Sequence, residues 1–77
     1  MPHIVVKMIS GRSDLLKREL AARLTQTAVD VLGVGEASIS VAIEDVAQGD
    51  WTAQVYVPDI QEKAAQIYKR PGYDPFA

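Results

Sequence analysis

The pattern of apolar and polar positions divides the chain into three regular elements and a less regular C-terminal third. Residues 2–9 are rich in β-branched side chains and apolar on nearly both faces, which is typical of a strand inside a sheet. Residues 13–32 carry an apolar residue every four positions, which predicts an amphipathic helix between an N-cap at Ser13 and a stop at Gly33. Residues 38–46 alternate, as in a strand with one buried face. The order predicts a βαβ unit with parallel strands.

The C-terminal third predicts a helical extension over residues 50–70. Trp51 and Val55 are four positions apart, as on one face of a helix. Pro58 suits the first turn of a second helix, where its missing N–H would have no partner in any case. A strand through residues 54–57 is the alternative.

The short chain indicates that the fold needs a further source of stability beyond its own core. A domain of 77 residues buries only roughly 60% of the surface that its unfolded chain exposes. The chain has no cysteine, so disulfides and thiolate metal sites cannot reinforce it. Two strands and one helix do not form a stable sheet alone. We therefore expect one α/β domain over residues 1–77 whose sheet is completed by a partner subunit in a homo-oligomer.

Charge and hydropathy exclude two classes of partner. The net charge is −2 and no run of basic residues is present, whereas nucleic-acid binding needs a cationic patch. No stretch approaches the roughly 20 apolar residues of a membrane span, and the N-terminus does not resemble a signal peptide. We expect a cytoplasmic protein that binds neither nucleic acid nor membrane.

Candidate catalytic groups are few. The chain has one histidine, His3, no cysteine and no glycine-rich phosphate-binding loop. The informative feature is the dipeptide Met1-Pro2, because removal of Met1 would leave Pro2 as a secondary amine that accepts a proton. Burial of that amine would keep it neutral and suited to act as a base. Position alone favours a proline that merely begins a strand, since many chains begin with Met-Pro.

Several segments in the same order resemble the 4-oxalocrotonate tautomerase family. They are Pro2 at the start of a strand, residues 11–14 (Gly-Arg-Ser-Asp) before the helix, and residues 38–41 (Ser-Ile-Ser-Val) opening the second strand. The C-terminal third, with Trp51 and the Pro-Gly-Tyr run at 71–73, is similar to the longer bacterial PptA-type branch. The resemblance implies a βαβ tautomerase subunit with a C-terminal helical extension. It also implies an isomerase that interconverts keto and enol groups without cofactor or metal.

The resemblance also implies roles for individual residues. Pro2 matches the family's general base, and Arg12 matches an arginine that binds the substrate carboxylate. Trp51 matches an aromatic position that keeps the proline pocket apolar. Ser40 stands in the substrate site where the best-known members carry a second arginine, which favours a 2-keto monocarboxylate over a dicarboxylate. Strand alternation predicts that the side chain of His3 points to the other face from Pro2.

Two other functions fit the same pattern. One is a proline-dependent hydratase or dehalogenase acting on unsaturated acids, and the other is a non-catalytic oligomeric binding module. For the assembly we expect a homodimer in place of the hexamer common among shorter relatives. The reason is that the extra C-terminal helix would occupy the sheet face where further dimers dock.

Overall fold

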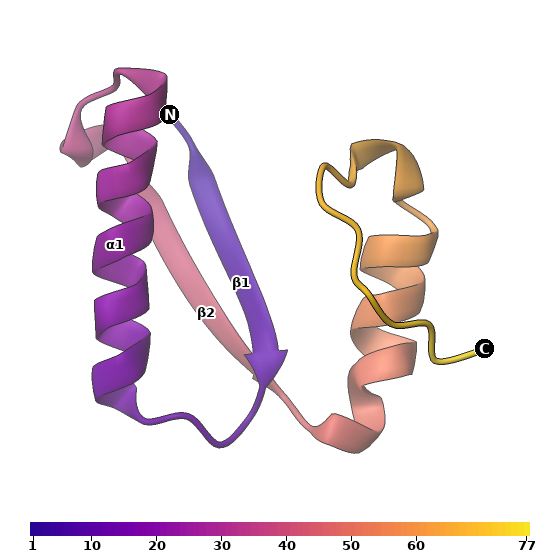
Figure 1. Cartoon of the computed structure of the whole chain (residues 1–77). Helices are drawn as coiled ribbons and strands as arrows, with labels where there is room; N and C mark the ends of the chain where they lie inside the picture. The colour runs from indigo at the N-terminus through magenta and orange to yellow at the C-terminus, as the bar shows by residue number, and fades with distance from the viewer. The chain divides into compact units, whose positions relative to one another are not determined.

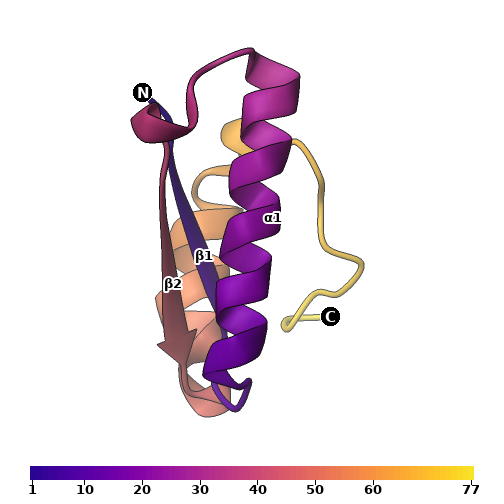
Figure 2. The ribbon, with the colours of Figure 1, turned by 90° about the vertical axis from the view of Figure 1, so that its left-hand side faces the viewer.

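The N-terminal part of the chain is a βαβ unit. The computed structural model describes residues 1–77 and divides them into two units, of which the first is Met1–Asp45. Strands β1 (His3–Ile9) and β2 (Ser40–Val46) are neighbours in a parallel two-stranded sheet. Helix α1 (Asp14–Leu32) lies along one face of the two strands (Figures 1 and 2). The predicted βαβ core is therefore confirmed.

Both ends of α1 are fixed by the residues that the sequence indicated. The backbone of Ser13 is extended, and its Oγ accepts a hydrogen bond of 3.2 Å from the amide of Leu16. This bond satisfies one of the free N–H groups of the first turn. At the other end Gly33 adopts φ +68°, and its amide donates to the carbonyl of Val29 at 3.0 Å. A left-handed residue at this position is the usual way to end a helix, and glycine adopts it without strain.

The second strand begins two residues later than the sequence predicted. Glu36–Ser38 form one turn of 3₁₀-helix, labelled η1, before β2 starts at Ser40. The amide and the hydroxyl of Ser38 both donate to the carbonyl of Gly35, at 3.0 Å and 2.7 Å. Serine competes for backbone partners in this way, which favours a turn over continued strand pairing.

The two faces of the sheet differ in what covers them. Lys17 of α1 forms an ion pair with Asp45, so the side of β2 that carries Ile43 and Asp45 faces the helix. His3 and Ser40 are hydrogen-bonded to each other across the opposite face. No element of the N-terminal unit covers that second face (Figure 2).

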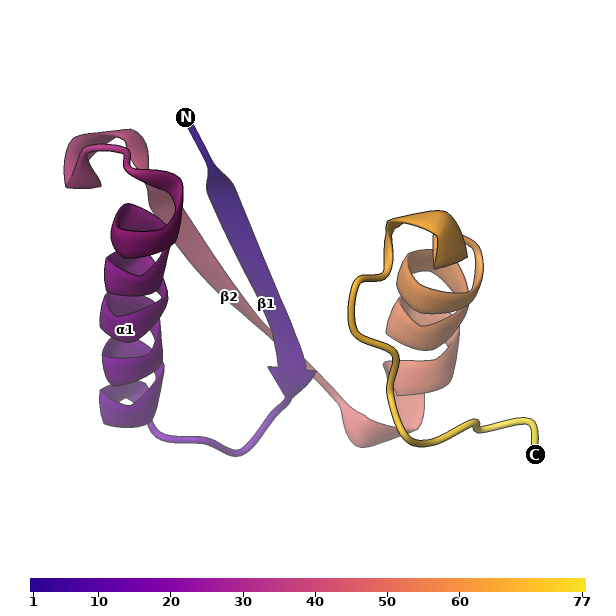
Figure 3. The same ribbon diagram turned by 45° about the horizontal axis from the view of Figure 1, so that its top comes forward.

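The C-terminal unit, Val46–Ala77, is a helical segment followed by a returning tail. A short turn, η2 (Gln48–Asp50), leads into η3 (Thr52–Gln61), which is a π-helix, and then into η4 (Ala64–Gln66). The chain then turns and runs back beside η3 (Figures 1 and 3). The predicted helical extension is present, and the alternative strand over residues 54–57 does not form.

Pro58 does not start a second helix, so that prediction was wrong. It lies inside η3, where the amide of Glu62 donates to the carbonyl of Val57, five residues earlier, at 2.9 Å. In an α-helix the proline ring would clash with the carbonyl four residues before it. The wider π-helical turn moves that carbonyl away, so the helix continues through the proline. Helical structure ends at Gln66, four residues before the predicted limit.

The single chain buries few side chains. Three residues are buried, all apolar, and they are Ala28, Val46 and Val55. Several large apolar side chains remain exposed, including Leu15, Leu16, Val31, Leu32 and Phe76. A protein of this size normally compensates for a small core by association, as the sequence also predicted.

Candidate active site

Pro2 lies at the start of β1 and is fixed through its carbonyl. The carbonyl oxygen accepts a hydrogen bond of 3.2 Å from the amide of Ser40, at the first residue of β2. Pro2 is half-buried, whereas Met1 before it is fully exposed. While Met1 is attached, the nitrogen of Pro2 is part of an amide and cannot accept a proton. Its chemistry therefore depends on removal of Met1.

Ser40 is held by both of the residues that begin β1. Besides the amide bond to Pro2, its Oγ lies 2.6 Å from Nδ1 of His3. Both side chains of the His3–Ser40 pair are exposed. Strand alternation places the ring of Pro2 and the side chain of His3 on opposite faces of β1, so the predicted side for His3 stays a prediction with respect to the substrate.

Arg12 lies at the far end of the same strand. It is exposed and follows β1, and one of its guanidinium N–H groups (Nη1) donates to the carbonyl of Ile9 at 3.0 Å. The seven residues of β1, at roughly 3.3 Å each, separate Pro2 from Arg12 by about 23 Å. Within one protomer the structure does not bring the predicted base and the predicted carboxylate-binding residue together.

Trp51 belongs to the C-terminal unit, where aromatic side chains hold the tail against the helical segment. Its Nε1 donates a hydrogen bond of 2.8 Å to the hydroxyl of Tyr73. The rings of Tyr56 and Tyr73 have centroids 5.6 Å apart, and Phe76 meets Tyr56 edge-on at 6.0 Å. Both arrangements are favourable for aromatic pairs. The sequence singled out Trp51 but gave no spacing signal for the cluster, because its members come from segments about twenty residues apart.

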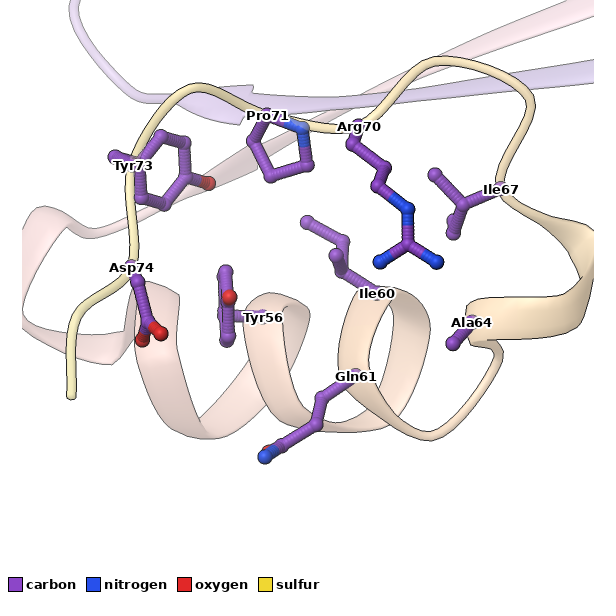
Figure 4. Close-up of a pocket in the computed structure, with 9 residues that line it drawn as sticks. All are labelled: Tyr56, Ile60, Gln61, Ala64, Ile67, Arg70, Pro71, Tyr73 and Asp74. Atoms are coloured by element: carbon purple, nitrogen blue, oxygen red, sulfur yellow. The ribbon is translucent and has the colours of Figure 1, made fainter. Parts of the chain in front are cut away.

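A cavity of about 340 Å³ lies between η3 and the tail, and it contains none of the four predicted site residues. The side chain of Arg70 reaches into it between Ile60 and Ile67 (Figure 4). The other lining residues are Tyr56, Gln61, Ala64, Pro71, Tyr73 and Asp74. The sequence gave no indication of this cavity.

Two further classes of site are a metal centre and a membrane-spanning helix. No group of three or more histidine, aspartate or glutamate side chains is arranged to hold a metal ion. None of the helices combines the length and the apolar character needed to cross a membrane.

Comparison with known proteins identifies the family. A family model described as "Tautomerase enzyme" matches residues 2–59. A probable tautomerase of Xylella fastidiosa is 53% identical over 77 residues, covering 100% of this chain and 94% of the relative. The tautomerase PptA of an Enterobacter species (strain 638) is 35% identical over 74 residues, covering 95% and 97% of the two chains. The crystal structure of YwhB, a homologue of 4-oxalocrotonate tautomerase, superposes with a TM-score of 0.60 at 36% identity, over 61% of this chain and 77% of that one. The chain therefore belongs to the tautomerase family of isomerases, with the 4-oxalocrotonate tautomerase fold.

Proposed function

We propose that the protein is a keto–enol tautomerase of 2-keto monocarboxylates in which Pro2, freed by removal of Met1, is the general base. The observation that carries the proposal is the position of Pro2 at the open end of β1, in a tautomerase chain whose family match begins at that residue. A free N-terminal proline is a secondary amine, and its nitrogen has a lone pair for proton transfer.

The reaction needs one proton to move between carbon and oxygen. The neutral amine of Pro2 removes a proton from C3 of the keto acid, and the C–H electron pair becomes the C2–C3 double bond as the carbonyl oxygen gains charge. The resulting ammonium then returns its proton to that oxygen and yields the enol. An ordinary α-amino group has a pKa of about 7.7–8.0. A nearby arginine and an apolar wall both lower the pKa of such an amine and keep it neutral.

The 23 Å between Pro2 and Arg12 implies that a site containing both is built from two protomers. We place Arg12 of the partner subunit beside Pro2. β1 pairs with β2 along one edge only, and its other edge is open for pairing with a second copy. Two equal strands related by a two-fold axis through a shared sheet run antiparallel. The start of one β1 then lies beside the end of the other, which is where Arg12 of the partner subunit follows.

The remaining predicted residues complete this proposed site in a homodimer. Arg12 of the partner subunit binds the substrate carboxylate through charge-assisted hydrogen bonds. From the family resemblance we assign Trp51 to the apolar wall for an alkyl or aryl tail. Ser40 offers a neutral hydroxyl, so one carboxylate per substrate is accommodated.

The test is the rate at which an arylpyruvate interconverts between its enol and keto forms, followed by ultraviolet absorbance. N-terminal mass analysis first establishes that Met1 has been removed. Pro2→Ala should lower kcat/KM by at least about a hundredfold, with some activity left because alanine retains a primary amine. The acid limb of the kcat/KM profile should also shift, since a different amine titrates. Pro75→Ala, a change in the exposed tail, serves as the control.

A processed Pro2→Ala protein with wild-type rates would refute the proposed base. Full activity in a preparation that retains Met1 would do the same, because Pro2 is then an amide.

A further inference from the structure

The hydrogen bond between His3 and Ser40 joins two exposed polar side chains next to the proposed base. Nδ1 of His3 lies 2.6 Å from Oγ of Ser40, and the amide of Ser40 lies 3.2 Å from the carbonyl oxygen of Pro2. Exposed polar groups can also form hydrogen bonds with water. The hydrogen bond between His3 and Ser40 uses one donor or acceptor position on each side chain and limits the directions of their remaining hydrogen bonds. The geometry thus restricts where the Ser40 hydroxyl can donate.

The tautomer of His3 decides that direction. A serine hydroxyl has one hydrogen to donate and two lone pairs that accept. If Nδ1 of His3 lacks a hydrogen, Ser40 donates to the ring and has no donor left for a ligand. If Nδ1 carries the hydrogen, the ring donates to Oγ and the hydroxyl hydrogen is free to point away.

We infer that His3 is a positioning residue: its Nδ1–H holds Ser40 so that the hydroxyl donates to the carbonyl oxygen of the substrate. The inference rests on the proposed role of Pro2 as base. When that base removes the proton from carbon, negative charge develops on the carbonyl oxygen. An oriented donor at that oxygen lowers the barrier more than it strengthens binding of the ground state.

The pair also bears on specificity. A neutral hydroxyl stabilises a carbonyl oxygen by one hydrogen bond. It binds a second carboxylate only weakly, because carboxylates are bound most strongly by cationic side chains. The substrate class that fits is a 2-keto acid with a single carboxylate, bound by Arg12 of the partner subunit.

The first measurement reads the tautomer directly. His3 is the only histidine, so its ring nitrogens are resolved in ¹⁵N-correlated NMR spectra without assignment. We expect a hydrogen on Nδ1 in the wild-type protein and loss of this preference in Ser40→Ala. Ser38→Ala is the matched control, since Ser38 bonds to Gly35 and leaves the tautomer unchanged. A ring protonated on Nε2 alone in the wild-type protein would overturn the inference.

The second measurement is kinetic and separates orientation from folding. Ser40→Ala should lower kcat by about a hundredfold with little change in KM, the low end for the loss of one such donor. His3→Asn keeps an amide nitrogen near the place of Nδ1 and should retain kcat within a few-fold. His3→Gln places its amide further out, near the place of Nε2, and should fall toward the level of Ser40→Ala. The double variant His3→Gln with Ser40→Ala should be no slower than Ser40→Ala alone, because both changes remove the same donor.

Two outcomes distinguish failure of this inference from failure of the proposed function. If Ser40→Ala keeps wild-type kcat while Pro2→Ala is impaired, the His3–Ser40 pair has no catalytic role and Pro2 remains the base. Equal kcat values in folded His3→Asn and His3→Gln proteins would also overturn the positioning role. If Pro2→Ala is unimpaired, the proposed function itself fails.

Discussion

A mixture of two impaired variants should recover activity if the site spans two protomers. Pro2→Ala removes the proposed base, and Arg12→Ala removes the carboxylate-binding group. In one protomer these residues are separated by the length of β1, about 23 Å. No motion of a hydrogen-bonded strand closes that gap, so a site that uses both residues takes Pro2 from one chain and Arg12 from the other, as proposed above.

The size of the recovery follows from counting sites. Random pairing of equal amounts of the two variants makes half of the dimers mixed, and each mixed dimer has one site with both changes and one site with neither. About one quarter of all sites are then intact, and the mixture should reach about one quarter of wild-type activity. The Arg12→Ala parent alone loses about 1.5–3 kcal/mol of binding to carboxylate substrates, a rise in KM of roughly 10- to 150-fold. At low substrate concentration the homodimer of Arg12→Ala therefore contributes little to the activity of the mixture.

The assay is arylpyruvate tautomerisation after co-expression of the two variants with different affinity tags. Purification through both tags isolates the mixed dimer, which should show about half of wild-type activity. The double variant, with both changes in one chain, co-expressed with wild-type chain is the matched control. In that mixed dimer each site carries one change, so activity should be low. Absence of recovery in a mixed dimer of the two single variants, with its composition shown by native mass spectrometry, would refute the shared site.

Two further predictions concern the scaffold. Trp51 is the only tryptophan, so its fluorescence emission reports on the hydrogen bond to Tyr73. Tyr73→Phe should shift this emission to longer wavelength because water replaces the phenol as the partner of the indole N–H, whereas Tyr68→Phe, at an exposed position, should leave the emission unchanged. An unaltered spectrum in Tyr73→Phe would contradict the hydrogen bond between Trp51 and Tyr73. Gly33→Ala should lower the free energy of unfolding by about 1–2 kcal/mol in chemical denaturation, because alanine is strained at φ +68°, and Gly49→Ala, without a positive φ, should cost clearly less. Equal losses in the two glycine variants would be the contrary result.

The elements that the sequence predicted well are those governed by local rules. Helix α1 has a continuous apolar stripe and residues with strong preferences at both ends, Ser13 and Gly33, so its limits could be set closely. The C-terminal segment was harder because Pro58 is a helix breaker by α-helical rules. Its tolerance inside a π-helix depends on the backbone geometry around it, which composition does not reveal. The start of β2 depended similarly on whether Ser38 paired in the sheet or bonded to its own turn.

For the candidate site, the sequence predicts a set of residues but not their arrangement. The family resemblance indicated Pro2, Arg12, Ser40 and Trp51, yet it could not say which chain supplies each of them. The contact between His3 and Ser40 was missed because it joins residues 37 positions apart on two different strands. Cross-strand neighbours depend on the register of the two strands, which the hydrophobic pattern alone did not specify.

The small core of the single chain and the geometry of the proposed site have a common origin in the two-stranded sheet. A single two-stranded sheet leaves the outer edge of β1 unpaired and one face without cover from its own unit. Pairing that edge with a second copy satisfies its backbone groups and encloses apolar side chains. It also brings the start of one strand beside the end of another, which a lone βαβ unit cannot do with its own residues. In the proposed dimer the same interface would contribute to stability and to catalysis, so a substitution at the outer edge of β1 should affect both.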